Sequence, residues 1–151
     1  MEDKLTYRHA QGEINRQPCV FARALLAHHA VCELAVKQAG RRGVLCAQPV
    51  ARAACVQMWA LLREKTAFAV KRSPQSSVSP SVLLKIQCGG LNGLKSVLDA
   101  DTVAPDVHRL LRLAQEQHGD LSALPFSDIV KGVAAWKSQQ RRNAFPSTGQ
   151  E

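Results

Sequence analysis

The stretch PCVFARALLAHHAVCELAVKQAG (residues 18–40) opens on a proline, closes on a glycine and is rich in alanine and leucine between them. Proline suits the first position of a helix, glycine suits the position after its end, and alanine and leucine have high helix propensity. We therefore expect a helix from Cys19 to Ala39, on which the rest of the fold is built.

The stretch PVARAACVQMWALLREKTAFAVKR (residues 49–72) follows the same pattern. It also opens on a proline, and apolar side chains recur at helical spacing from Ala51 to Ala69 until Pro74 ends the pattern. A loop over residues 41–48 joins it to the first stretch. Two helices joined by a short loop run in opposite directions side by side, so the two stretches predict an antiparallel helical hairpin.

Further helices are expected in the second half of the chain. Ser79 and Pro80 mark the start of a short helix over 82–87, a segment that is also compatible with a short strand, and Cys88-Gly89-Gly90 breaks it. The other helices are expected over residues 91–100, 105–118 and 127–142. No alternation of apolar and polar residues indicates a sheet. The sequence therefore predicts an all-α fold, a single-domain helical bundle of five or six helices.

The length of 151 residues suits one domain. Residues 1–17 are polar without a clear period and are expected to form an N-terminal arm, and residues 143–151 are expected to form a flexible tail. Residues 18–142 make up the helical domain between them. Its one low-complexity segment, residues 73–80, is rich in Ser and Pro and is expected to be an exposed internal linker.

Charge and hydropathy bound the partners and the compartment. Twenty Lys and Arg against twelve Asp and Glu give a formal charge of +8, which attracts phosphate, acidic proteins or anionic lipid without choosing among them. No run approaches the ~18 apolar residues of a membrane span, and the start of the chain is acidic where a signal peptide is basic. We therefore expect a cytoplasmic protein without a membrane span.

Five cysteines are the most informative residues for function: Cys19, Cys32, Cys46, Cys55 and Cys88. An odd number cannot pair completely in internal disulfides, and a chain expected in a reducing compartment keeps its thiols free. Thiolates bind iron–sulfur clusters and zinc because soft sulfur matches these metals. The cysteines therefore predict metal or redox chemistry.

The expected hairpin brings three of these thiols together. Cys32 and Cys55 lie about 10 Å and 9 Å from the closed end of the hairpin, at a rise of about 1.5 Å per residue, and Cys46 is in the loop that covers this end. Cys88 is the expected fourth ligand, because Gly89 and Gly90 allow the backbone to approach and offer N–H groups to the cluster sulfurs.

Cys19 is an alternative fourth ligand. A continuous helix places it ~20 Å from Cys32, so one centre takes both only if residues 18–22 are loop. Cys19 then replaces Cys88.

Two other interpretations of the cysteines stay open. No spacing typical of ferredoxins or zinc fingers occurs, and free cysteines are often small buried residues of a core. Zinc is the second alternative, because His28 precedes Cys32 by four residues and, with Cys46 and Cys55, would complete a site of three cysteines and one histidine.

The sequence thus predicts a small protein that binds a [4Fe–4S] cluster for electron transfer or redox sensing. It would serve as an accessory subunit of a larger redox enzyme or dock an acidic redox protein through its positive surface. No catalytic residue is predicted. The rival interpretation is a metal-free or zinc-binding basic helical adaptor, or a nucleic-acid-binding module, that works through Arg41-Arg42, Lys71-Arg72 and Arg141-Arg142.

Overall fold

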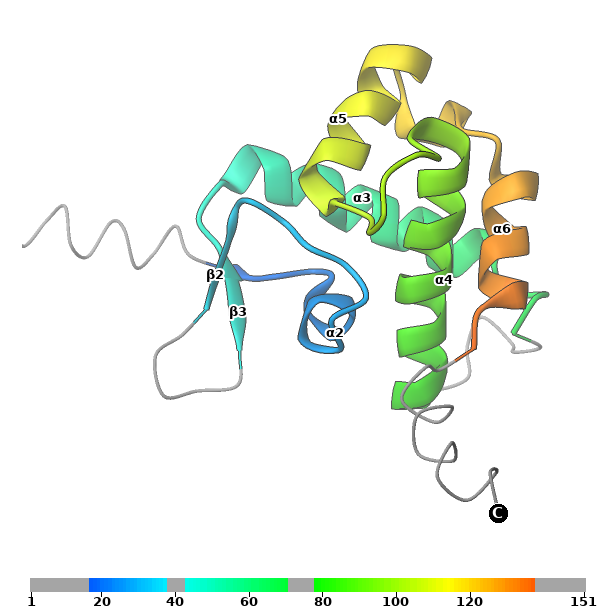
Figure 1. The fold of residues 1–151 in the computed structure, drawn as a ribbon, viewed down its shortest axis with the longest axis horizontal. Coiled ribbons are helices and arrows are strands. Elements are labelled where there is room, and N and C mark those ends of the chain that lie inside the picture. The colour runs from blue at the N-terminus through cyan, green and yellow to red at the C-terminus, as the bar shows by residue number, and fades with distance from the viewer. Residues whose placement is uncertain (1–16, 38–42, 71–77, 138–151) are drawn as a thin grey trace, which may run out of the picture.

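A computed structural model of the protein describes residues 17–37, 43–70 and 78–137. This part of the chain is helix-rich, as predicted, but it also contains a small antiparallel sheet of three strands, so the all-α prediction holds only in part (Figure 1). The elements in chain order are β1 (Gln17–Pro18), α2 (Ala22–Leu26), β2 (Ala35–Lys37), β3 (Val44–Cys46), α3 (Pro49–Lys65), α4 (Pro80–Leu98), α5 (Val107–His118), the 3-10 helix η1 (Leu121–Ala123) and α6 (Phe126–Ala135).

The long helix expected from Cys19 to Ala39 does not form: in the described part of this stretch, residues 19–37, α2 is the only α-helix. His28 has a φ of 62°, in the left-handed region, where an α-helix cannot continue. Beyond it, the N–H of Val31 donates to Pro105 O, and Val31 O accepts from the N–H of Val107. Pairing with a distant segment thus overrides the helix propensity of the alanines and leucines.

The sheet has the strand order β1-β3-β2, with β3 in the middle. Cys46 lies opposite Gln17 on β1 and opposite Ala35 on β2. Each strand has only two or three residues, which is too short for an alternating pattern to be visible in the sequence. The short strands and α2 therefore occupy the region in which the first helix of the hairpin was expected. The prediction of an antiparallel helical hairpin is wrong.

The helix that starts at Pro49 is confirmed, although it ends at Lys65 instead of near residue 72. The buried Thr66 hydroxyl donates to Leu62 O at this end. In Figure 1, α3 runs from the sheet toward α4 and α6, which stand side by side. It therefore connects the small sheet to the helical part of the molecule.

Residues 80–98 form one continuous helix, so the break predicted at Cys88-Gly89-Gly90 is wrong. The predicted start is confirmed, because Ser79 Oγ accepts from the N–H of Val82 at the first turn. Gly89 lies against α6: a β-carbon on it would come within 2.5 Å of Val133 Cα and 2.8 Å of Gly132 O. Glycine here serves close helix packing and does not make a turn.

α4 and α6 are antiparallel along this contact. Gly93, one turn after Gly89, faces the backbone of Ile129, and Lys85 Nζ donates to Trp136 O at 3.3 Å at the other end. The amino-terminal end of α4 therefore meets the carboxyl-terminal end of α6.

α5 closes at Gly119, as predicted from the sequence, and begins two residues later than expected. α6 begins at Phe126, one residue earlier than expected. The described part of the chain thus contains five α-helices, the lower of the two numbers predicted.

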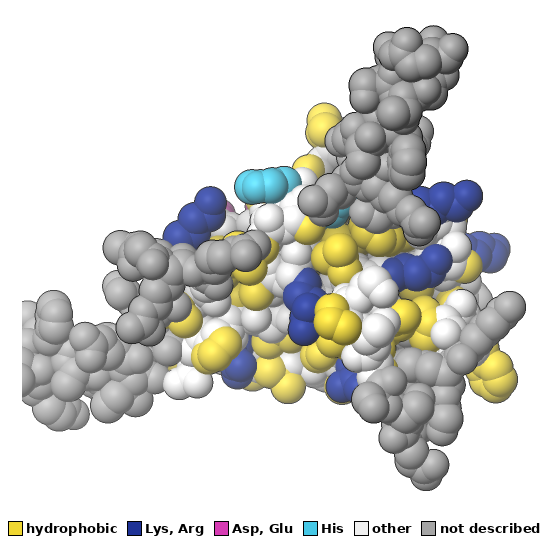
Figure 2. All heavy atoms as spheres, turned by 90° about the horizontal axis from the view of Figure 1, so that it is seen from below, with side chains coloured by type: hydrophobic (Ala, Val, Ile, Leu, Met, Phe, Trp, Pro, Cys, Tyr) yellow, Lys and Arg dark blue, Asp and Glu magenta, His cyan; other side chains and the backbone are white. Residues whose placement is uncertain are grey.

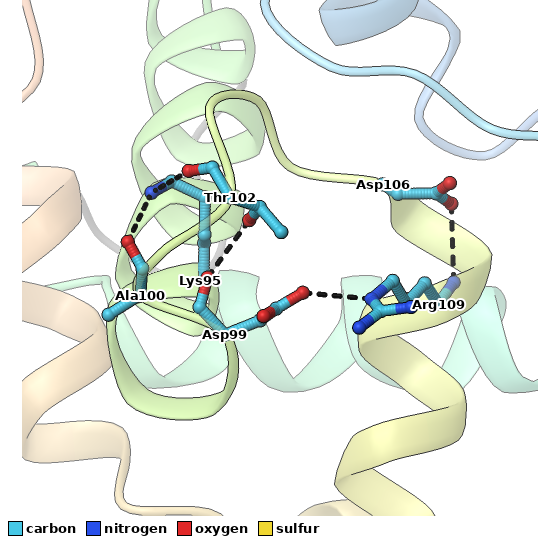
Figure 3. A network of polar contacts seen from close by, with 6 residues as sticks. All are labelled: Lys95, Asp99, Ala100, Thr102, Asp106 and Arg109. Carbon is cyan, nitrogen blue, oxygen red and sulfur yellow. Dashed lines mark hydrogen bonds and ion pairs between the residues drawn. The ribbon is translucent and has the colours of Figure 1, made fainter.

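A polar network holds the connection between α4 and α5 (Figure 3). Lys95 Nζ donates to Thr102 O at 2.8 Å, and Arg109 Nε pairs with Asp99 Oδ2 at 2.8 Å. Asp106 caps α5 by accepting from the N–H of Arg109 at 3.2 Å. Together with the pairing of Val31, this network fixes the start of α5 against the segment that carries Cys32.

A buried glutamine ties α2 to α4. Gln87 is 3% exposed; its Oε1 accepts from the N–H of Ala24 at 3.1 Å and its Nε2 donates to Val20 O at 2.8 Å. Both ends of the amide are satisfied, so its burial fixes the path of the chain after Cys19.

Some of the sequence predictions fall outside the described residues. They concern nearly all of the arm over 1–17, most of the linker over 73–80, the tail over 143–151, and all three arginine-containing dipeptides. Among the described helices, none combines the length and apolar character needed to cross a bilayer.

Candidate metal centre

Four cysteines line one pocket of about 380 Å³: Cys19, Cys32, Cys46 and Cys55. They come from four segments of the chain. Cys19 follows β1, Cys32 lies between α2 and β2, Cys46 ends β3, and Cys55 lies in the second turn of α3. The pocket includes Cys19, which local pattern offers only as an alternative to Cys88.

The fold brings these segments together through the backbone. The N–H of Cys19 donates to Val44 O at 2.8 Å, which places Cys19 beside the strand that carries Cys46. Arg52 Nε donates to Pro18 O at 2.8 Å and so ties the start of α3 to the same edge. Cys19 approaches the other three cysteines because residues 19–21 are not helical.

Cys88 lies outside this pocket. It is 1% exposed in the middle of α4 and belongs to the hydrophobic core. Gly89 and Gly90 are interior residues of the same helix, so the predicted turn that would offer N–H groups to a cluster is not formed. For Cys88, the interpretation as a small buried core residue therefore agrees with the structure.

His28 is not part of the lining either. It faces a neighbouring cavity that shares Cys32 with the thiol pocket. His108 lines the thiol pocket instead, and its Nδ1 lies 2.8 Å from Glu33 Oε1. His108 reaches the cysteines because Val31 pairs with Pro105 and Val107, which brings the start of α5 to the pocket. These segments are far apart along the chain, so no local sequence pattern indicates His108.

Backbone N–H groups donate to two of the sulfurs. Burial raises the pKa of the Cys19 thiol, and the N–H of Phe21 donates to its Sγ and acts in the opposite direction. Burial also raises the pKa of Cys32, against N–H donors from Leu34 and His108. Each sulfur thus accepts from the residue two positions later, an arrangement that stabilises a thiolate and orients it as a ligand.

Burial disfavours the thiolate form of Cys19, Cys32 and Cys55, because it raises the pKa of each. It raises the pKa of Cys55 to about 12, with added repulsion from the thiolates of Cys19, Cys32 and Cys46. These interactions indicate that the four sulfurs are near enough to influence one another electrically. A bound cation would remove the repulsion and displace the protons.

The permanently charged residues that line the pocket are two arginines, Arg52 and Arg112. Among the residues that the structure describes, no Asp or Glu lines it. Arg52 opposes the rise in the pKa of Cys19 and of Cys55. Its position three residues before Cys55 on a predicted helix is a signal that sequence analysis could have used. The pocket therefore combines four thiols, two cations and mostly apolar walls.

No three His, Cys, Asp or Glu side chains within the described residues are placed to hold a single metal ion. A tetrahedral zinc site with Zn–S bonds of about 2.3 Å requires thiolates only about 4 Å apart. The four cysteines line one cavity, and His28, the histidine of the zinc alternative, is not among its lining residues.

The buried thiols predict a loss of stability in alkali. Cys55 and Cys88 both have pKa values raised to about 12 by burial, whereas an unfolded cysteine ionises at about 8.5. Above about pH 8.5 the unfolded chain loses protons that the folded chain keeps, so the unfolding free energy should fall as the pH rises toward 12. Urea titrations of the metal-free protein measure this slope.

A Cys88→Ala variant is the matched control for this slope. It should show a shallower decline with pH than the wild type, since one of the two buried thiols is gone. Identical slopes would mean that Cys88 ionises equally well in both states.

No protein-family model, curated protein or solved structure matches this chain.

Proposed function

We propose that the protein binds a [4Fe–4S] cluster through Cys19, Cys32, Cys46 and Cys55 and uses it for electron transfer or redox sensing. The observation that carries the proposal is that four cysteines from four chain segments line one pocket. Cys88, the remaining cysteine, packs in the core and is left out of the ligand set.

The size of the pocket suits a cluster better than a single ion. A cubane of four irons and four sulfides is larger than one zinc ion, so its ligands surround a volume instead of a point. The pocket of about 380 Å³ is compatible with this requirement.

The charges around the pocket suit an anionic group. Four thiolates and the sulfides give a bound cluster a net negative charge, which Arg52 and Arg112 offset. The apolar walls, with Val20, Leu34 and Leu111 among them, limit access of water to the site.

The ligand set argues for electron transfer or sensing and against substrate chemistry at iron. When bound, a [4Fe–4S] cluster supplies a one-electron couple, and four cysteines leave none of its four irons open to a substrate. The residues of this chain would hold the group, exclude water from it and tune its potential. An accessory subunit of a redox enzyme and an independent sensor both need these properties.

Iron and sulfide analysis of protein purified without oxygen tests the proposal. Near-equal amounts of iron and acid-labile sulfide, close to four of each per chain, are expected for a cubane. One zinc per chain and no sulfide would show that the protein binds zinc instead of a cluster. A metal-free protein that folds normally would refute both.

Arg52 should raise the reduction potential of the cluster. Its guanidinium is anchored to Pro18 O and acts electrostatically on Cys19 and Cys55, so it stabilises the more negative, reduced state. An Arg52→Gln variant should lower the midpoint potential by roughly 60 mV, which corresponds to about 1.4 kcal/mol for one electron. Potentiometric titration measures the shift.

Lys131→Gln is the charge-matched control, because Lys131 lies on α6 with its side chain 79% exposed and pairs with Asp128. It should leave the potential unchanged. Equal shifts of the midpoint potential in both variants would mean that the potential depends only on the net charge of the protein and not on the position of Arg52.

A further inference from the structure

A second groove shares the Cys19–Val20 segment with the thiol pocket. It has a volume of about 470 Å³ and lies between α2, α3 and the amino-terminal half of α4. Its principal side chains are Arg23 from α2, Trp59 and Arg63 from α3, and Leu83 and Gln87 from α4. The groove therefore adjoins the proposed cluster without containing its other ligands.

The groove is basic. Arg23 and Arg63 line it, and no acidic side chain of the described ranges does so. Of the eight acidic residues that the structure describes, Glu33 precedes β2 and Glu64 follows Arg63 on α3. The other six all lie between the end of α4 and the first turn of α6: Asp99, Asp101, Asp106, Glu116, Asp120 and Asp128. In Figure 1 this is the upper end of the molecule, whereas α4 begins at the lower end.

The surface at the lower end of the molecule is also basic. Seen from below, Lys and Arg side chains stand among hydrophobic ones and acidic side chains are nearly absent (Figure 2). Charge of one sign over an end of a protein attracts a polyanion from a distance and orients it. The distribution of acids and bases thus directs an anionic partner to the end of the molecule where the groove lies.

An aromatic ring, Trp59, lies beside one of these cations in the groove lining. The Arg63 guanidinium lies 5.8 Å from the centroid of the Trp59 ring, and Phe21 meets Trp59 edge to face at 6.1 Å. Trp59 is partly exposed. Arginines beside an aromatic ring are the combination with which proteins bind single-stranded nucleic acid, because the cations take phosphates and the ring takes a base.

We infer that this groove binds single-stranded nucleic acid and that the redox state of the cluster controls the affinity, a coupling that rests on the proposed function. Arg23 and Arg63 contact phosphates, and Trp59 stacks on a base. A duplex keeps its bases stacked on each other and leaves none for Trp59. An acidic protein would satisfy the arginines but offers no base to the ring.

The sign of the coupling follows from the electrostatics. Cys19 and Val20 form part of both cavities, and Cys55 and Trp59 lie four residues apart on one face of α3. Reduction adds one negative charge beside the groove, so the reduced protein should bind a polyanion more weakly than the oxidised protein. By reciprocity, bound nucleic acid should make the cluster harder to reduce.

Fluorescence anisotropy with a labelled oligothymidylate of about 12 nucleotides tests the groove on full-length protein purified without oxygen. An Arg23→Ala variant should bind about tenfold more weakly, and the slope of log K against log salt should fall in magnitude by about 0.7, the value per neutralised phosphate of a single strand. The control Lys131→Ala, on α6 and outside the groove lining, should leave affinity and slope unchanged. Equal iron content and circular dichroism establish that the variants are folded.

Competitors identify the class of partner. A blunt duplex and poly-glutamate should compete at least tenfold more weakly than unlabelled oligothymidylate. Equal competition by the duplex, equal competition by poly-glutamate, or an unchanged affinity of the Arg23→Ala variant would each overturn the assignment.

The redox arm compares the same protein oxidised and reduced with dithionite. The oxidised protein should bind about fivefold more tightly, and saturating oligothymidylate should lower the midpoint potential by about 40 mV, the same factor at 59 mV per tenfold. Equal affinities in the two states would remove the coupling. Protein that contains no iron but still binds the oligonucleotide through Arg23 would refute the cluster and support nucleic-acid binding by the groove. Protein that contains the cluster but binds no oligonucleotide would support the cluster and refute nucleic-acid binding.

Discussion

Serine in place of Cys19 should abolish the cluster, whereas alanine in place of Cys88 should leave it intact. Cys19 lines the pocket with Cys32, Cys46 and Cys55, but Cys88 lies within the core. A serine hydroxyl is a poor ligand for iron, because it is harder than sulfur and does not ionise near neutral pH. The two substitutions therefore distinguish the proposed ligand set, which includes Cys19, from the set with Cys88 that a long first helix would impose.

Iron and sulfide per chain, measured on protein prepared without oxygen, give the result. Cys19→Ser should retain less than about a tenth of the wild-type iron, and Cys55→Ser should behave in the same way. Cys88→Ala should retain all of it, with some loss of stability from the small cavity in the core, about 1 kcal/mol. Full iron in Cys19→Ser together with loss in Cys88→Ala would reverse the assignment.

The sequence predicts part of the site for reasons that hold in the structure. Five free cysteines in a chain expected to stay reduced indicate a thiol function, and the start of α3 at Pro49 puts Cys55 in its second turn. Cys46 is expected near this end of α3 because only a short loop separates them. Composition, proline positions and short separations along the chain carry this information.

The fourth cysteine of the pocket, Cys19, could not be chosen from local sequence pattern. Residues 18–40 have the alanine and leucine content of a helix, and a helix would keep Cys19 far from Cys32. The chain instead turns at His28, and Val31 pairs with Pro105 and Val107, more than seventy residues away in sequence. Helix propensity is a sum of small local terms, and contacts of this kind outweigh it without leaving a local signal.

Glycine illustrates the same limit. Gly89 and Gly90 side by side have the composition of a turn, and local pattern alone favours a break at this point. In the structure Gly89 is required because the backbone of α6 lies against it, whereas Gly90 faces the side chain of Leu62. Whether a glycine marks a turn or a close helix contact depends on the partner helix, which sequence pattern does not specify.

Alanine in place of Gly93 should destabilise the fold by about 3 kcal/mol, even though alanine favours helix by about 1 kcal/mol. A β-carbon at this position would collide with Ile129 O and come within 2.9 Å of Ile129 Cα. These are backbone atoms of an intact helix, so they cannot rotate away as a side chain can. The two helices must separate, which loosens the packing around Ile129 and Val133, both 0% exposed.

Gly90→Ala, on the same helix, is the matched control, because the three atoms nearest to its β-carbon would all belong to the side chain of Leu62, the first of them at 2.9 Å. Leu62 can shift, so the unfolding free energy should change by less than about 1 kcal/mol, as read from urea midpoints at equal slope. Gly93→Ala protein that still folds in the cold should keep its iron, since α4 and α6 supply none of the four ligands. Equal stability of the two variants would contradict a backbone contact at Gly93, and α4 and α6 would then have to lie farther apart.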